Sequence, residues 1–249
     1  MQTPIDIYEW TSSWALDSGL KLWRLPETDS TNTTAKDDTD PTTRPELAMG
    51  AQVSAPSLYL TRLQVRGRGR GTNVWQAPTG SALFHSWSFQ VARVPQPVLS
   101  PLVGLALFRA AKGAWPDVEL NLKAPNDLYI GRAKVAGILI EIVDQGPNKR
   151  VVIGIGMNVM SHPADVATAT SLARYRVPSH QEWAAFMTSL REGLERAVRE
   201  GLGGSLSEPA REDLKQALNL HPLYNEPIEH VDELGQLHRA SGIIRWHEL

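Results

Sequence analysis

The sequence of 249 residues contains no cysteine. Disulfide bonds, metal sites built on thiolates and a cysteine nucleophile are therefore excluded from the chemistry of the protein. An absence of cysteine is compatible with the reducing environment of the cytosol, and we expect a cytoplasmic protein.

Long apolar runs are also missing. No stretch approaches the roughly 20 apolar residues that a membrane helix needs. The first ten residues, MQTPIDIYEW, lack a basic start followed by an apolar run, so we expect no secretory signal peptide.

The sequence has no overall excess of positive charge, because 25 Lys and Arg face 27 Asp and Glu, for a net charge of −2. The pI of about 6.4 lies well below the value of roughly 9 that nucleic-acid-binding domains usually exceed. We therefore expect neither a nucleic acid nor a membrane as a partner. Positive charge that gathers locally is better suited to a small anion.

Hydrophobic residues make up 42% of the chain, which is enough for a sizeable core. The length fits a large domain with a small appendage, which we place at 1–222 and 223–249. Runs with alternating or continuous apolar residues predict strands. The expected strands are 21–25, 57–65, 81–91, 118–130, 133–143 and 150–160. Short turns containing Gly or Pro join the last three, which indicates an antiparallel meander.

Helical patterns occupy the rest of the chain. A mostly apolar, buried helix is expected over 97–115, and shorter ones after Ser30 and over 207–219. The longest helix begins near residue 180, where apolar residues recur on one helix face: Trp183, Phe186, Met187, Leu190, Leu194 and Val198. The tail predicts a hairpin with ELGQ at its turn. Together these elements predict an α+β fold, a largely antiparallel mixed sheet flanked by helices, with a short C-terminal β segment.

The stretch QVRGRGRGTNVWQAPTG, at 64–80, alternates three arginines with glycines. Glycine lets backbone N–H groups approach a ligand closely, and arginine binds phosphate or carboxylate through two parallel hydrogen bonds. No Gly-Lys-Ser/Thr follows, so the stretch is not a P-loop. A disordered RGG-type RNA-binding segment and a plain exposed loop are the alternatives.

A second polar group lies in LKAPNDLYIGRAKVAGILIE, where Lys123 ends a predicted strand and Asn126 and Asp127 follow at the turn. A lysine, an amide and a carboxylate could bind phosphate and a metal ion together. A turn with solvated charges is the alternative. Lys134, on the next strand, is either a device of an edge strand or a ligand contact.

A third pattern, VVIGIGMNV at 151–159, contains two glycines inside a predicted strand. Such glycines usually mark the close approach of a ligand or of another backbone. Asn158 then offers one donor group and one acceptor group. A β-bulge is the alternative.

Four linked motifs follow one another from Asp29 to Asn158: DSTN, Q-x-x-GRGR-x4-W-x-x-P-x-G, K-x-PND-x6-K-x-AGIL-x-E and VIGIGMN. In order and rough spacing they resemble the motifs of biotin protein ligases. The resemblance implies the catalytic core that biotin ligases share with lipoate ligases and class II aminoacyl-tRNA synthetases. With 28 residues before Asp29, we expect a catalytic domain without a DNA-binding domain.

The resemblance also implies a reaction with ATP and biotin as substrates and Mg²⁺ as cofactor. The carboxylate of biotin attacks the α-phosphate of ATP, which gives biotinyl-AMP and pyrophosphate. A lysine amine of a biotin carboxyl carrier protein domain then attacks the mixed anhydride. The protein itself is expected to be a monomer or a homodimer.

The same resemblance assigns residues to the parts of a site. Biotin contacts fall to Ser30, Thr31, Asn32, Gln64, Gly67, Arg68, Lys134 and Gly137. Nucleotide contacts fall to Arg70, Trp75, Asn126 and Asn158. The catalytic groups are Lys123, Arg68 and Asp127, of which Asp127 either binds Mg²⁺ or receives a proton from the acceptor.

The sequence departs from the family pattern after Arg70, where Gly71-Thr72-Asn73-Val74 lacks the usual further arginine. Ala77 and Ala124 also replace the usual serine and tryptophan. A catalytically weakened biotin- or nucleotide-binding module is therefore one alternative, and a lipoate or octanoate ligase or transferase is another. We expect residues 66–74 to be mobile without ligand and to become ordered over the activated biotin.

Overall fold

The computed structural model describes residues 5–40 and 42–248. Pro41, in the surface loop predicted after residue 36, and residues 1–4, at the start considered for a signal peptide, lie outside the described residues. Within the described ranges, no helix combines the length and apolar character needed to cross a membrane.

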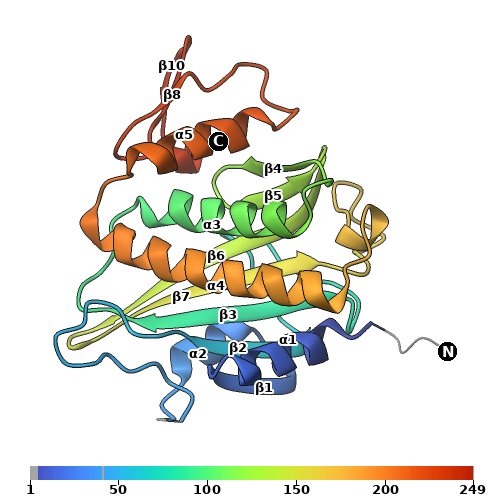
Figure 1. Cartoon of the computed structure of the whole chain (residues 1–249), viewed down its shortest axis with the longest axis vertical. Coiled ribbons are helices and arrows are strands. Elements are labelled where there is room, and N and C mark those ends of the chain that lie inside the picture. Colours follow the sequence, from blue (N-terminus) through green and yellow to red (C-terminus); the bar gives the residue numbers. More distant parts are fainter. Residues whose placement is uncertain (1–4, 41, 249) are drawn as a thin grey trace.

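A seven-stranded sheet with the order β1-β2-β3-β7-β6-β5-β4 forms the centre of the molecule (Figure 1). Only β1 and β2 run parallel, and every other neighbouring pair is antiparallel. The strands are β1 Lys21–Thr28, β2 Ser57–Gln64, β3 Ala82–Gln90, β4 Leu120–Lys123, β5 Asp127–Ile130, β6 Ala133–Gln145 and β7 Asn148–Asn158. The predicted α+β class and the meander are confirmed, and 118–130 forms two short strands on either side of the turn predicted after Lys123.

Three helices cover one face of this sheet: α1 Ile7–Asp17, α3 Leu99–Ala114 and α4 His180–Gly203 (Figure 1). The predicted apolar face of α4 is confirmed, since all six of its residues are buried. Its first turn is closed by a capping box between Ser179 and Glu182. At Gly193 an added Cβ would lie 3.0 Å from the Cβ of Ala106, so glycine lets α4 pack tightly on α3.

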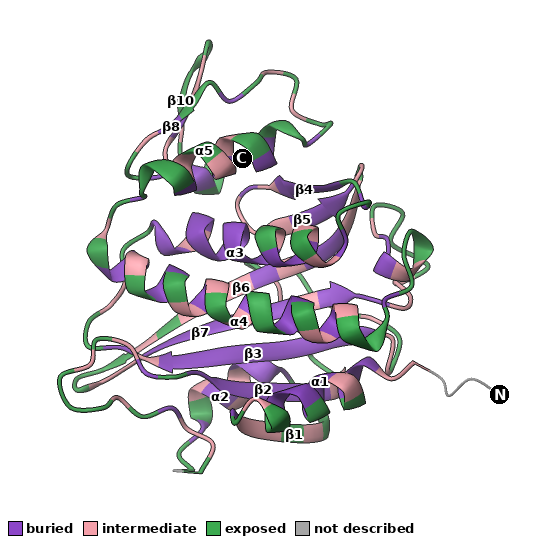
Figure 2. Ribbon diagram, in the orientation of Figure 1, coloured by how far each residue is buried: buried purple, intermediate pink, exposed green. Residues whose placement is uncertain are grey.

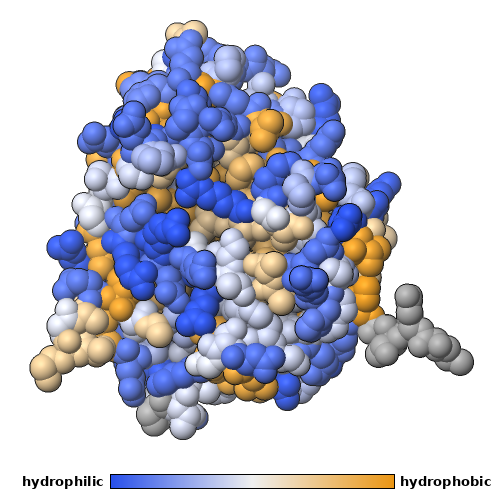
Figure 3. Space-filling view, in the orientation of Figure 1, coloured by the Kyte–Doolittle hydropathy of each residue, from blue (hydrophilic) through white to orange (hydrophobic). Residues whose placement is uncertain are grey.

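The covered face holds the main core, because successive side chains of a strand point to opposite faces. On β7, Ile153, Ile155 and Met157 are buried in this core. The buried stripes run along the sides of α3 and α4 that face the sheet (Figure 2). On the outer surface of this layer, hydrophilic residues predominate and hydrophobic ones form small separate groups (Figure 3).

The short helix α2, Thr31–Asp37, packs against β2, β3 and β7 on the opposite face. The motif DSTN, with Asp29 and Ser30 before the helix, favours a cap by a side chain, and this expectation is wrong. Ser30 is the N-cap residue but makes no side-chain cap bond. Instead the N–H group of Thr31 donates to Oε1 of Gln64 at 2.8 Å, because β2 brings that amide to the start of the helix.

The C-terminal region lies beyond β4, at the end of the molecule opposite α1 and α2 (Figure 1). Helix α5, Glu208–Asn219, confirms the helix predicted there, and the predicted hairpin pairs β8 His230–Val231 with β9 Leu237–Arg239. A third strand, β10 Gly242–Ile244, was not predicted. Two side chains of this region reach back to the turn after β4. The indole nitrogen of Trp246 donates to the carbonyl of Pro125 at 2.8 Å, and the hydroxyl of Tyr224 accepts from the N–H of Ala124 at 3.0 Å.

Candidate active site

A cavity of about 470 Å³ lies on the face of the sheet that carries α2. Its walls come from the start of α2, the loop after β2, strands β5, β6 and β7, and the segment 163–169. Most residues assigned from the sequence line it together: Ser30, Thr31, Asn32, Gln64, Arg68, Arg70, Trp75, Asn126, Asp127, Lys134, Gly137 and Asn158. The structure does not place Gly67 or Lys123 in the lining.

The arginine–glycine loop forms a small hairpin over the cavity, which we call the 67–75 hairpin. The N–H of Trp75 donates to the carbonyl of Gly67 at 3.0 Å, and the N–H of Gly69 donates to the carbonyl of Asn73 at 2.7 Å. Gly71 occupies the tight turn with a φ of 62°, which favours glycine. Whether this segment is mobile without ligand stays a prediction.

The glycines inside β6 and β7 make room for side chains. An added Cβ at Gly156 would lie 2.4 Å from Nε1 of Trp75, and one at Gly137 would lie 2.9 Å from Cζ3 of the same indole. At Gly154 it would lie 2.2 Å from Oδ1 of Asn32. The register of β7 with both neighbouring strands is continuous here, so the β-bulge alternative is wrong. The expected close approach exists, but site side chains make it.

Polar groups gather where α2 meets the sheet. Oε1 of Gln64 accepts from the backbone N–H and the hydroxyl of Thr31, at 2.8 and 3.2 Å. The hydroxyl of Ser86 lies within hydrogen-bond distance of Thr31 and Asn32, at 2.7 and 2.6 Å. This end of the cavity therefore holds several oriented amide and hydroxyl groups.

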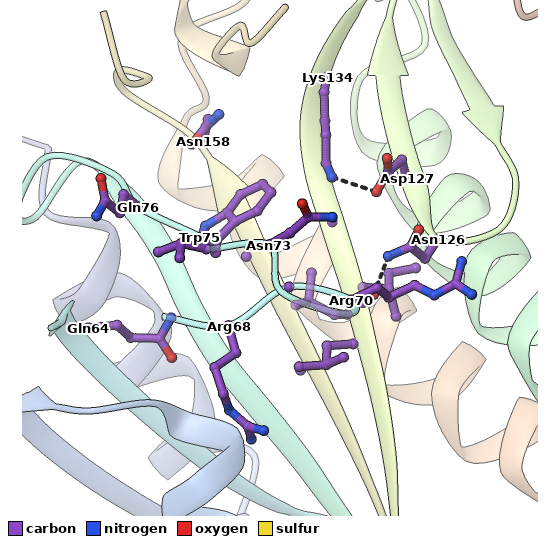
Figure 4. A pocket seen from close by; sticks show the side chains of 18 of the residues that line it. Gln64, Arg68, Arg70, Asn73, Trp75, Gln76, Asn126, Asp127, Lys134 and Asn158 are labelled. Carbon is purple, nitrogen blue, oxygen red and sulfur yellow. Dashed lines mark hydrogen bonds and ion pairs between the residues drawn. The ribbon is translucent and has the colours of Figure 1, made fainter. Parts of the chain in front are cut away.

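The other end of the cavity is charged. The ammonium group of Lys134 lies 2.7 Å from Oδ1 of Asp127 and 5.2 Å from the ring centroid of Trp75 (Figure 4). Asn126 donates from its amide to the carbonyl of Ile138 at 2.8 Å, which fixes the turn beside them. Strand β6 lies between β5 and β7, so Lys134 is not on an edge strand and that alternative is wrong. The guanidinium of Arg70 has no ion-pair partner among residues 5–40 and 42–248.

Lys123 lies outside the cavity lining, although it pairs directly opposite Asp127 in the antiparallel β4–β5 pair. Its ammonium lies 5.8 Å from the ring centroid of Tyr129, at the side of β4 that meets the C-terminal region. Burial, with the nearby charge of Lys123, lowers the pKa of His221 to about 4. Directly opposed residues of an antiparallel pair point to the same face, and the catalytic role of Lys123 stays a prediction.

Sequence reasoning missed Glu141, although it belongs to the motif AGIL-x-E. Its carboxylate accepts hydrogen bonds from Lys36 at 2.6 Å, from Asn32 at 2.9 Å and from both terminal nitrogens of Arg68, at 3.1 and 2.6 Å. Burial raises the pKa of Glu141, but these hydrogen bonds outweigh burial and hold the pKa below its ordinary value.

The residues of the cavity fit a magnesium ion only if a nucleotide supplies most of its ligands. Across the described part of the chain, no group of three His, Cys, Asp or Glu residues could hold a metal. Asp127 is a single carboxylate donor in the cavity and is already paired with Lys134. Mg²⁺ commonly takes one or two carboxylates and completes its shell with water and substrate phosphates, so Asp127 suits an ion that arrives with a nucleotide.

A model of the biotin/lipoate A/B protein ligase family matches residues 26–158. The chain belongs to this family. That finding confirms the resemblance inferred from the four motifs, all of which lie within the matched residues. The family description covers lipoate ligases as well as biotin ligases.

Several relatives in the family are biotin ligases by name. The chain is 34% identical over 116 residues to biotin–protein ligase 1, chloroplastic, of Arabidopsis thaliana, which covers 44% of this chain and 31% of that protein. It is 35% identical over 131 residues to biotin–[acetyl-CoA-carboxylase] ligase of Mycobacterium tuberculosis, covering 50% and 47%. The matched segment thus spans about a third to a half of these relatives.

Solved structures of the family share the fold. Biotin protein ligase from Aquifex aeolicus, in complex with biotin and ATP, superposes with a TM-score of 0.64 at 21% identity, over 90% of this chain and 94% of that one. At this identity the likeness shows the fold alone, and it extends past the matched residues to nearly the whole chain.

Proposed function

We propose that this protein is a biotin–protein ligase that activates biotin with ATP and transfers the biotinyl group to a lysine of a biotin carboxyl carrier domain. The observation that carries the proposal is the polarity of one cavity. Its α2 end presents oriented amides and hydroxyls, and its β5–β6 end presents Lys134 and Arg70. A ligand with a polar neutral head and an anionic tail matches that order.

The polar end favours biotin over lipoate or octanoate. Biotin's ureido ring needs fixed donors and acceptors, whereas a dithiolane or an alkyl chain needs an apolar slot. We assign the ureido contacts to Ser30, Thr31, Asn32 and Gln64. The amide nitrogen of Gln64 has no protein partner in the described ranges, so this donor is available to a ligand oxygen. A relative's name alone would not distinguish these ligands, since the family includes both kinds of ligase.

In the first step the carboxylate of biotin attacks the α-phosphorus of ATP. A new P–O bond forms as the bond to pyrophosphate breaks, so two anions must approach each other. We assign the neutralising charges to Lys134 and Arg70, because preorganised cationic donors stabilise charge that builds in the transition state. Lys123, opposite Asp127 in the β4–β5 pair, is a further candidate for this charge. Trp75, Asn126 and Asn158 are assigned to the nucleotide.

In the second step the acceptor amine attacks the carbonyl carbon of biotinyl-AMP, a C–N bond forms, and AMP leaves with the bonding electrons. The attacking nitrogen must lose a proton, and we assign Asp127 as the group that receives it. When ATP carries Mg²⁺, the ion supplies further positive charge at the phosphates, and Asp127 is the protein group that would contact it.

The test measures ATP–pyrophosphate exchange by the purified chain with biotin, lipoate or octanoate as the acid. Biotin should support the fastest exchange and should raise the melting temperature further when ATP is added. Faster exchange with lipoate or octanoate would overturn the choice of ligand. Binding of biotin without exchange would identify a binding module. Transfer is followed separately as biotin incorporated into a carrier domain.

A further inference from the structure

The carboxylate of Glu141, near the middle of β6, joins three parts of the site that are far apart in sequence. Lys36 and Asn32 reach it from α2, and Arg68 reaches it from the 67–75 hairpin. We call these four residues the Glu141 cluster. Its carboxylate is only 20% exposed, so water screens the charges less than at an open surface.

Arg68 binds this carboxylate through both terminal nitrogens, one to each oxygen, at 3.1 and 2.6 Å. A two-point pair of this kind fixes direction as well as distance. Figure 4 shows Arg68 and Arg70 leaving the hairpin in different directions, with Arg70 passing Asn126 on the side of Asp127 and Lys134. The two arginines of the loop therefore have different surroundings.

We propose that Glu141 is a positioning residue that anchors the 67–75 hairpin over the cavity through Arg68 and orients the amide of Asn32. Arg68 is then the anchor of the loop, and Arg70 is its anion contact. This replaces the assignment of Arg68 to the reacting groups. The anchor follows from contacts within the chain, and only the identity of the anion rests on the proposed function.

The anchor has a physical purpose in a loop of this composition. Gly67, Gly69 and Gly71 give the free loop many conformations, and the positive charges of Arg68 and Arg70 repel each other. One half-buried carboxylate opposes both effects by holding one of the two guanidiniums. Glu141 also balances Lys36, so without its charge two cations would face each other across the polar end of the cavity.

Helix α2 does not depend on Glu141 for its place. The guanidinium of Arg150, which is buried, donates to the carbonyls of Ala35 at 2.8 Å and Lys36 at 2.6 Å, at the end of the helix. The hydroxyl of Tyr59 donates to Asp38 at 2.5 Å just beyond. Removing the charge of Glu141 should consequently release the hairpin while the helix remains in place.

The experiment compares Glu141→Gln with Glu195→Gln. Glu195 lies on α4, is also 20% exposed, and is also paired with two basic residues, Arg191 and Arg199, at 3.0 and 3.3 Å. Hydrogen exchange is measured on the full chain without added ligand. We expect amides of 64–76 to exchange at least about tenfold faster in Glu141→Gln, with α2 unchanged, and no change of the loop in Glu195→Gln.

A double-mutant cycle with Arg68→Gln separates anchoring from substrate contact. If Arg68 acts through Glu141, the double variant should lose no more biotin affinity than the more affected single variant, about tenfold. If Glu141→Gln does not fold, Arg68→Gln still tests the proposal, because it removes the charge of the other member of the ion pair. Unchanged loop exchange in a folded variant, or losses of affinity that multiply in the double variant, would overturn the proposal. If the wild type binds no biotin, the proposed function fails. The same double-mutant cycle, measured by hydrogen exchange of the 67–75 hairpin, still tests whether Glu141 anchors the hairpin.

Discussion

The two faces of the central sheet are formed by the same strands but serve different purposes. On β7, Ile153, Ile155 and Met157 point toward α3 and α4 and are almost fully buried. The residues between them, Gly154 and Gly156, lie on the face of the cavity. One face of β7 has large apolar side chains and fills space, whereas on the other face Gly154 and Gly156 leave space for Asn32 and Trp75.

The comparison teaches that stability and function are separated here by strand alternation. Burial of large side chains on the helix face supplies the hydrophobic stabilisation, at roughly 25 cal/mol per Å² of apolar surface. The cavity face contributes little apolar burial but fixes the positions of polar groups. Substitutions on the two faces should therefore differ in kind, and the following predictions test that separation.

The largest effect should follow Phe186→Ala on α4. Phe186 is 1% exposed and lies in the core on the helix face, so its truncation should lower the free energy of unfolding by about 3–5 kcal/mol. Ligand binding by the remaining folded protein should stay normal. Denaturant unfolding measures the loss, and Ser189→Ala, at an exposed position of the same helix, should have almost no effect. A stable variant with weakened ligand binding would contradict the separation.

Lys134→Ala should have the next largest effect, and it should be confined to activity. Removing one preorganised cationic donor costs roughly 10²–10³ in rate. The matched control is Lys149→Ala, since Lys149 is paired with Asp144 at 2.6 Å and its side chain is 25% exposed, against 29% for Lys134. Pyrophosphate exchange and the melting temperature are measured together. Comparable exchange by the two variants would remove Lys134 from the proposed mechanism.

A titratable group on the helix face gives a prediction for pH. Burial lowers the pKa of His85 to about 3, although its Nδ1 bonds the carbonyl of Ile155 at 3.0 Å. The unfolded chain therefore binds a proton near the ordinary pKa of 6.5 and the folded chain does not. Stability from this residue is complete above pH 6.5 and is lost as pH falls toward 3, by about 2 kcal/mol at pH 5.

Replacing this histidine should flatten the acid side of the stability profile. His85→Asn removes the titration, so unfolding free energies measured from pH 7 to pH 5 should fall by about 2 kcal/mol less than in the wild type. His221, whose pKa is also lowered, remains in both proteins and cancels. Parallel profiles would show that His85 is not buried in its neutral form.

The smallest effect should come from one methyl group on the cavity face. In Gly156→Ala the new Cβ would meet the indole of Trp75 at 2.4 Å, so the indole must move. We expect nucleotide affinity to fall about tenfold, with a stability loss near 1–3 kcal/mol. Gly113→Ala, in α3 with nothing within 4 Å of the added Cβ, should raise stability by about 0.5–1 kcal/mol. Titration calorimetry measures the nucleotide affinity, and an unchanged affinity in Gly156→Ala would count against the assigned role of Trp75.

Strand and helix patterns made much of the fold predictable, because periodicity reports which residues share a buried face. The six apolar residues of α4 and the strands with β-type alternation are clear examples. Helix α1 was missed, since its polar residues Thr11 and Ser12 are buried and break the apolar pattern. The indole of Trp183 explains one of them, because its nitrogen donates to the hydroxyl of Thr11 at 3.0 Å.

The motifs of the site could be predicted from the sequence, but which of their residues line the cavity could not. The resemblance assigned both Lys123 and Lys134 to the site, but only Lys134 lines the cavity. Lys123 pairs opposite Asp127, but the cavity lining reaches only Asn126 and Asp127 of this turn, and spacing carries no information about where a cavity ends. Glu141 was overlooked because its partners come from two other segments, α2 and the 67–75 hairpin, which only the folded chain brings to β6.

The contacts of Tyr224 and Trp246 with the turn at Ala124 and Pro125 have a consequence for how the protein is made. These partners follow the turn by 100 and 121 residues in the chain. A ribosome therefore releases the turn that carries Asn126 and Asp127 long before it synthesises the side chains that hold it. Until then a nascent chain has these polar groups without their support, and the proposed activity should arise only after Trp246 has been synthesised.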